Sequence, residues 1–306
     1  MNGSSLRLES QAVELAWSLW AGLGIPAWVG HHESQAIDPE HLILFTAFLR
    51  DDDPRLRDEA TTWCVHFGRY LSTVRFRNLL MTEAPTVRSA FGEFSATINA
   101  HSRLALPAAT TPRAYRPTAG PSLSEFDQHS QVALRLRAAF GVNARAEILR
   151  ILLAEAAGHG RSVADMATEA GFTKRNIADA CVALEMGSVL LETRVRNQFR
   201  YRLRDSEAFK RFLGSVPDAF PPWRSVFHVV ERLLETVRSA ESLPAQVQQI
   251  EALKVVDELT GDLQIARVYP PQLKRPAFDA WSAFTDWAIH LVSDWAEGRS
   301  PRYLIA

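Results

Sequence analysis

The sequence predicts a mainly α-helical protein that carries one short β-hairpin near its middle. Over most of the 306 residues, apolar side chains recur at the three- and four-residue spacing typical of amphipathic helices. Around residue 200 this spacing gives way to a β-prone run and then to an alternation of period two, which indicates strands. Hydrophobic residues make up 47 % of the chain and charged residues 23 %, the composition of a folded protein.

Residues 1–103 are predicted to form a helical domain. A first helix runs over about residues 6–20, and three more begin near Asp38, Asp53 and Ser72. Each of these three residues is a good N-cap, and the first two precede a proline, which suits the first helical position. The tryptophans of this segment are expected in its core: Trp17, Trp20, Trp28 and Trp63.

A proline-rich linker is predicted over residues 104–122, because four prolines stand there among Thr and Ala residues. A connecting helix is expected over residues 123–141. Either Ser122 or Ser124 is its candidate N-cap, and Gly141 ends it.

Residues 142–214 carry the most informative pattern of the chain. A helix is expected over residues 143–157, Ser162 caps a second short helix, and Thr173 caps a third one just after Gly171. Two helices joined by so tight a turn are typical of a helix-turn-helix.

The helix-turn-helix needs three residue types in register, and all three are present. Ala167 is the small residue at which the second helix crosses the first, and Ile177 is the apolar anchor of the second helix. Gly171 stands in the turn, where the backbone takes a positive φ.

A β-hairpin is predicted directly after these helices. Residues 189–195 are β-prone, Asn197 and Gln198 supply a turn, and residues 199–204 alternate apolar and basic side chains as a half-buried strand does. The predicted order is therefore three helices followed by a two-stranded hairpin.

This order resembles the winged helix-turn-helix module of bacterial transcription regulators, in the arsenic-repressor-like and multiple-antibiotic-resistance-repressor-like grouping. The resemblance covers about residues 142–212 and implies that the second helix of the motif enters the major groove of duplex DNA. An arginine there can pair with guanine and an asparagine with adenine, while the basic hairpin follows the phosphate backbone. The implied DNA-binding residues are Thr173, Lys174, Arg175, Asn176, Arg194, Arg196, Arg200, Arg202 and Arg204.

The charge distribution agrees with a local basic surface. The net charge of −1 excludes a uniformly basic nucleic-acid binder. Residues 142–214 nevertheless carry 12 Lys and Arg against 9 Asp and Glu, whereas residues 1–103 and 215–306 each carry 9 against 12. A basic module between acidic flanks can touch a polyanion while the flanks limit nonspecific binding.

Residues 215–306 are predicted to form three amphipathic helices. Their apolar stripes either support a homodimer, because two-fold DNA readers need a second copy, or belong to an internal core. The N-terminal helical domain is the expected place for an effector or a protein partner.

Several functional classes are not expected. His31-His32-Glu33 lacks the second histidine of a helical zinc motif, and no phosphate loop or nucleophile elbow occurs, so no catalytic residue, metal or cofactor is predicted. Two cysteines cannot form a disulfide framework, which favours the reducing cytoplasm. No apolar run is long enough to cross a membrane, and the N-terminus is unlike a signal peptide.

One alternative of a different class stays open. In it the winged helix docks onto another protein, and the chain acts as the antitoxin-like partner of a toxin enzyme. This alternative depends on analogy at the level of the fold.

Overall fold

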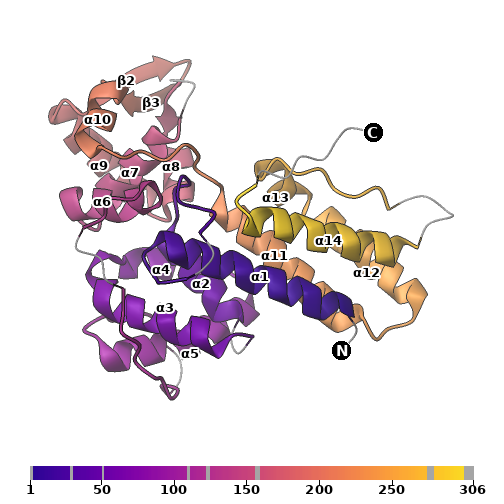
Figure 1. The fold of residues 1–306 in the computed structure, drawn as a ribbon. Coiled ribbons are helices and arrows are strands. Elements are labelled where there is room, and N and C mark those ends of the chain that lie inside the picture. The colour runs from indigo at the N-terminus through magenta and orange to yellow at the C-terminus, as the bar shows by residue number, and fades with distance from the viewer. Residues whose placement is uncertain are drawn as a thin grey trace.

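The computed structural model describes residues 3–27, 30–49, 52–108, 111–121, 125–155, 159–273 and 279–299. Within these ranges the protein is mainly helical, with one small antiparallel sheet (Figure 1). The helices are α1 (Gly3–Gly22), α2 (Pro39–Leu49), α3 (Pro54–Phe67), α4 (Thr73–Leu80), α5 (Pro85–His101), α6 (Val132–Phe140), α7 (Ala144–Leu153), α8 (Val163–Ala170), α9 (Lys174–Met186), α10 (Ser206–Leu213), α11 (Trp223–Ala240), α12 (Ala245–Glu258), α13 (Thr260–Ile265) and α14 (Ala280–Ala296).

Most predicted helix starts are confirmed by the capping geometry. The Asp53 carboxylate accepts the N–H groups of Arg55 and Leu56, and the Ser72 hydroxyl accepts that of Arg75. Asn143 caps α7 in the same way. The predicted caps of the connecting helix at residues 122 and 124 lie outside the described residues; α6 itself begins later, after the 3-10 turn His129–Gln131.

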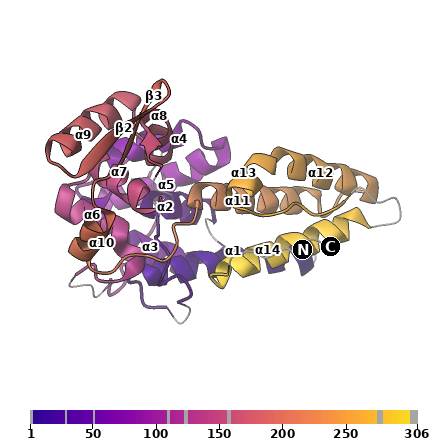
Figure 2. The same ribbon diagram turned by 90° about the horizontal axis from the view of Figure 1, so that it is seen from above.

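The two ends of the chain pack into one hydrophobic core. Helix α1 lies along α14, and α2 packs against α11, so the first and last parts of the sequence share their buried side chains. Figure 2 shows α11 to α14 and part of α1 projecting from the rest of the molecule as a helical arm. The apolar stripes of α11 and α14 are buried against other helices of the same chain.

The predicted core tryptophans differ in their surroundings. Trp20 and Trp63 are fully buried and contact each other edge to face, with ring centroids 5.3 Å apart. Trp17 is only partly buried and donates its indole N–H to Asp53 at 2.7 Å. Trp28 lies outside the described residues.

A second hydrophobic cluster forms around α7, α8, α9 and the sheet. Strand β2 (Leu190–Val195) pairs with β3 (Gln198–Leu203) in the predicted antiparallel hairpin. The sheet has three strands rather than the predicted two, because β1 (Arg161–Ser162) pairs with the other edge of β3.

The third strand depends on the glycine that precedes it. Gly160 has a φ of 71°, and a Cβ atom there would lie 2.9 Å from the carbonyl oxygen of Tyr201. Without a side chain at this position, the backbone before α8 approaches β3 closely enough to pair with it.

The His31-His32-Glu33 segment, considered above as a metal motif, joins the two ends of the chain. His32 is 1 % exposed and its ring nitrogens share hydrogen bonds with Ser18 Oγ at 2.7 Å and the Trp295 carbonyl at 2.9 Å. Burial lowers the pKa of His32 to about 4. The imidazole is therefore neutral at neutral pH.

The neutral His32 predicts a loss of stability in mild acid. Because its pKa in the folded chain lies below the ordinary value, the unfolded chain binds the proton first, and the stability falls as the pH drops from about 6.5 toward 4. We expect His32→Gln to remove about 3 kcal/mol of this decline, as measured by urea unfolding at pH 7 and pH 4. Equal declines in the two proteins would contradict the prediction.

No helix within the described ranges is both long and apolar enough to span a lipid bilayer.

Candidate nucleic-acid interface

The α8–α9 turn, residues 171–173, sets the direction of α9. Gly171 adopts the left-handed conformation (φ 67°, ψ 34°), and its N–H caps α8 by donating to the Ala167 carbonyl. The Thr173 hydroxyl then accepts the N–H of Asn176 at 3.2 Å and starts α9. The predicted cap and the predicted positive φ are both confirmed.

The buried residues of α8 and α9 hold the two helices together. Ala167 is 6 % exposed where the helices cross, and Ile177 is fully buried. Helix α7 packs against both α8 and α9, and β2 packs against α9. This packing fixes the first turn of α9 relative to the hairpin.

The first turn of α9 presents polar side chains to solvent. Thr173, Lys174, Arg175 and Asn176 are all exposed. Among the described residues, no partner forms a side-chain hydrogen bond or ion pair with Lys174 or Arg175. Their donors are available to a ligand.

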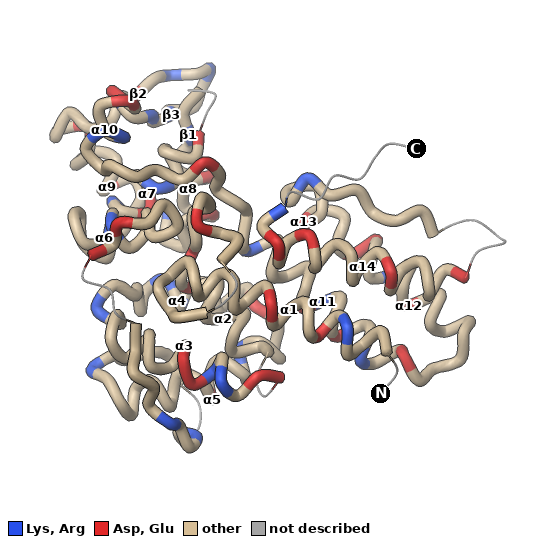
Figure 3. Tube along the Cα trace, in the orientation of Figure 1, with Lys and Arg blue, Asp and Glu red and all other residues tan. Residues whose placement is uncertain are grey.

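The hairpin arginines differ in their exposure to solvent more than the alternation predicted. Arg194, Arg196 and Arg204 are exposed, whereas Arg200 and Arg202 are half-buried. Arg196 lies at the tip of the hairpin with a φ of 54°. Basic residues gather at this tip, far from the helical arm (Figure 3).

Two hairpin arginines bond to the backbone of the sheet. Arg200 donates to the Gly160 carbonyl at 2.8 Å, and Arg204 donates to the Leu190 carbonyl at 3.4 Å. Arg194 stands over the ring of Phe199, 5.9 Å from its centroid. Of the five hairpin arginines, Arg194, Arg196 and Arg202 have guanidinium groups that form no hydrogen bond or ion pair with another described residue.

Helix α4 holds the α8–α9 turn from the other side. Arg75 Nε donates to the Ala170 carbonyl at 2.9 Å, and Asn78 Nδ2 donates to the Gly171 carbonyl at 2.9 Å. Both carbonyls belong to the end of α8, which has no further helical partners for them. The N-terminal helices therefore contact the candidate interface directly.

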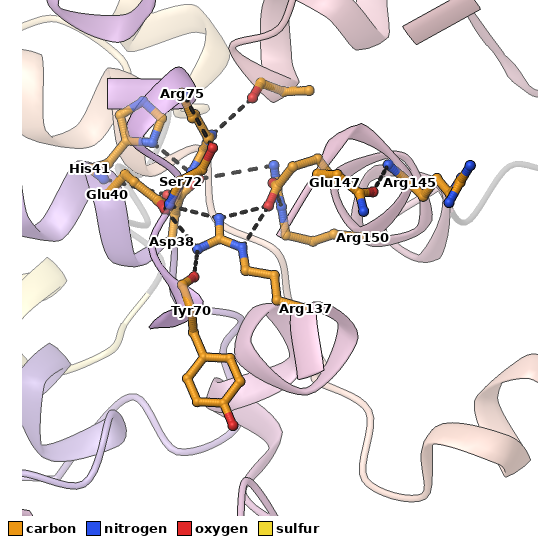
Figure 4. Close-up of polar contacts among 12 residues, drawn as sticks. Asp38, Glu40, His41, Tyr70, Ser72, Arg75, Arg137, Arg145, Glu147 and Arg150 are labelled. Carbon is orange, nitrogen blue, oxygen red and sulfur yellow. Dashed lines mark hydrogen bonds and ion pairs between the residues drawn. The ribbon is translucent and has the colours of Figure 1, made fainter. Parts of the chain in front are cut away.

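Arg75 also belongs to a buried ion network that joins α2, α4, α6 and α7 (Figure 4). Its guanidinium contacts Asp38 at 2.5 Å and Glu40 at 2.6 Å. Arg137 contacts Glu40 and Glu147, each at 2.7 Å. The ion network consists of Asp38, Glu40, Arg75, Arg137, Glu147 and Arg150.

The ion network carries no net charge, because its three arginines face three carboxylates. Burial alone would raise the pKa of Glu147, but Arg137, Arg75 and Arg150 outweigh it and lower the pKa to about 2. Buried charges of this kind are tolerated only when each has a partner.

The sequence did not predict the ion network. Asp38 is the predicted cap of α2, and its carboxylate does accept the His41 N–H, at 3.4 Å, but its short contacts are with Arg75. The network partners are distant in the sequence, as in Glu40 and Arg137, which lie 97 residues apart. A local signal was present, because Arg137 lies on the otherwise apolar buried face of α6.

Substituting Gly171 tests the α8–α9 turn. A Cβ atom there would lie 3.2 Å from both Arg75 Cγ and Leu79 Cδ2, on a backbone that L-residues rarely adopt. We expect Gly171→Ala to lower the free energy of unfolding by about 1–3 kcal/mol in urea titrations. The control is Gly261→Ala in α13, where the new Cβ meets nothing within 4 Å and no loss is expected. Equal losses of stability in Gly171→Ala and Gly261→Ala would contradict a strained turn.

Comparison of the chain with protein-family models, curated proteins and solved structures finds no match in any of the three.

Proposed function

We propose that the protein is a sequence-specific, duplex-DNA-binding transcription regulator, with α7, α8, α9 and the β2–β3 hairpin as its winged helix-turn-helix. The observation that carries the proposal is the first turn of α9. A left-handed glycine and a threonine cap aim this turn outward, with Lys174, Arg175 and Asn176 exposed on it.

The charges of that turn favour an anionic partner. A helix N-terminus attracts negative charge, yet the first turn of α9 contains no acid and two cations. This placement opposes the helix dipole in the free protein, and phosphate groups or guanine edges would satisfy both the N–H groups and the cations.

The hairpin adds a second contact to the proposal. Arg196 at the tip and Arg202 on β3 have free guanidinium groups that suit phosphates or a narrow minor groove. A symmetric operator needs two such modules, so we include a homodimer in the proposal.

Fluorescence anisotropy tests the proposal most directly. The protein is titrated with its own upstream region and with random duplex DNA at two salt concentrations. With about five phosphate contacts per protomer, log affinity should fall against log salt with a slope of roughly −4 to −5, doubled for a dimer. The absence of binding at low salt would overturn the proposal.

A second candidate is the antitoxin-like role, in which the same module docks onto a protein. Its support is the exposed apolar surface beyond the first turn of α9, since Val182 is 50 % exposed and Met186 83 %, and Phe199 on β3 is 53 % exposed. Met186→Lys should weaken capture of a toxin enzyme encoded beside this protein and leave DNA binding unchanged. If Met186→Lys instead weakened DNA binding and left capture of the enzyme unchanged, the first candidate would be favoured.

A further inference from the structure

Strand β2 forms an open edge of the small sheet. The strand order is β1–β3–β2, so β2 pairs with β3 alone among the described strands. Its six residues include no proline, and its register with β3 runs unbroken from Leu190 to Val195. Figure 1 shows the hairpin far from the helical arm. A straight edge strand without proline or a bulge is a template on which a further strand can pair.

The backbone groups of β2 point alternately toward β3 and toward this open edge. The Val189 carbonyl accepts the Arg204 N–H at 2.9 Å, which fixes the phase of the alternation. The odd-numbered residues of β2 therefore bond to β3, whereas the N–H and C=O groups of Glu192 and Arg194 point outward. No described residue forms a hydrogen bond with these outward groups.

The side chains of β2 are complementary to a second copy of the same strand. In an antiparallel pair centred on Thr193, Glu192 of each copy faces Arg194 of the other. Leu191 of each copy then faces Val195 of the other, and the two threonines face each other. Opposite charges, aliphatic pairs and threonine pairs are all favourable across antiparallel strands.

The same centre brings the free backbone groups together. Glu192 and Arg194 both point outward, so each facing pair can exchange two N–H···O bonds. Centring the pair on Glu192 or on Arg194 would keep such bonds but would oppose two like charges, which is unfavourable. A centre between two residues would oppose outward groups to groups that already bond to β3. Thr193 is therefore the centre at which the backbone and the side chains agree.

Both charged side chains of β2 are able to bind a second copy. One carboxylate oxygen of Glu192 accepts the Tyr201 hydroxyl at 2.5 Å, and the other forms no hydrogen bond with a described residue. Arg194 is exposed and forms no ion pair within the described part of the chain. On the opposite face of the strand, Val195 is 47 % exposed, and pairing would cover it.

We propose that β2 is a homodimer interface, through which two copies of the chain join their sheets into one antiparallel sheet across a two-fold axis at Thr193. The partner is a second copy rather than a foreign strand, because the charge order of residues 191–195 is its own complement when the strand is reversed. The interface assigns Arg194 to the dimer instead of to DNA.

Cysteine cross-linking tests the register of this pairing. At the proposed centre the two copies of residue 193 form a non-hydrogen-bonded pair with Cα atoms about 4.5 Å apart, within reach of a disulfide. We expect Thr193→Cys to give a cross-linked dimer on oxidation with copper phenanthroline. The control is Leu191→Cys on the same face, because its two copies would lie four residues out of register, about 14 Å apart along the strand. The native Cys64 and Cys181 are buried and should not cross-link. No cross-link at residue 193, or equal cross-links at 191 and 193, would overturn the proposal.

Charge reversal tests the same interface without oxidation. Glu192→Arg and Arg194→Glu each oppose like charges in both facing pairs, so each should raise the dissociation constant of the dimer at least about tenfold in sedimentation. An equimolar mixture of the two folded variants restores opposite charges and should form a heterodimer. Arg211→Glu, at an exposed position on α10, should leave the dimer unchanged. A monomeric wild type, a dimer that Arg194→Glu leaves at full affinity, or a mixture of the folded variants that stays monomeric would overturn the proposal.

The dimer and the DNA contact are measured separately. That the dimer reads a symmetric operator rests on the proposed function. A dimer cross-linked at residue 193 that binds no duplex would reject the proposed function and leave the β2 interface standing. A monomer that binds duplex DNA with the expected salt dependence would reject the β2 interface and keep the DNA contact.

Discussion

Replacing Glu40 by Gln is expected to lower the free energy of unfolding by about 3–5 kcal/mol. Glu40 is fully buried, and its two oxygens accept hydrogen bonds from Arg75, Arg137 and the Ser72 N–H. Gln supplies one acceptor in place of two and leaves three arginines facing two carboxylates inside the protein. Urea unfolding at neutral pH, monitored by tryptophan fluorescence, measures the loss.

The same chemical change at an exposed ion pair is the control. Glu207 pairs with Lys210 at 2.8 Å, but its side chain is 70 % exposed, so Glu207→Gln should cost less than about 1 kcal/mol. Combining Glu40→Gln with Arg137→Met restores the charge balance, and the double variant should lose less than the sum of the single variants. Equal costs for Glu40→Gln and Glu207→Gln would show that the buried charges are not coupled.

The ion network connects the N-terminal helices to the proposed DNA-binding module. Asp38 and Glu40 come from the start of α2, whereas Arg137 and Glu147 come from α6 and α7. Arg75 then links these charges to the end of α8. Hydrogen bonds and ion pairs therefore run without a break from the N-terminal helices to the end of α8.

The sequence predicted the local features well, because their causes lie within a few residues. The caps Asp53, Ser72 and Ser162 each satisfy N–H groups two or three positions ahead. Gly171 was recognisable because a tight turn between helices requires a positive φ. The hairpin followed from an alternation of period two.

The sequence could not predict features that depend on distant partners. Helix α5 begins at Pro85 without a side-chain cap. Strand β1 is only two residues long and exists because β3 is beside it. A cavity beside Tyr70 likewise arises only when distant parts of the chain meet, with Phe126 and Leu213 also in its lining.

The double variant Arg175→Ala/Asn176→Ala is expected to remove the preference of the protein for its own upstream region. Each residue is proposed to make a bidentate contact with a base edge, and each such contact contributes about 1–3 kcal/mol of discrimination, so the two together amount to roughly 2–6 kcal/mol. Nonspecific binding should persist at low salt, because Lys174 and the hairpin arginines remain. Anisotropy with the upstream region and with random duplex measures both affinities.

The matched contrast is Arg196→Ala/Arg202→Ala, which removes two exposed or half-buried hairpin cations and no base-reading residue. This variant should weaken both duplexes alike and reduce the magnitude of the salt slope by about 2, since each phosphate contact contributes about 1. The α9 variant should therefore change the ratio of the affinities for the upstream region and for random duplex. The hairpin variant should lower both affinities and keep their ratio. If the α9 pair lowered both affinities equally and kept the ratio, α9 would contact phosphates rather than base edges.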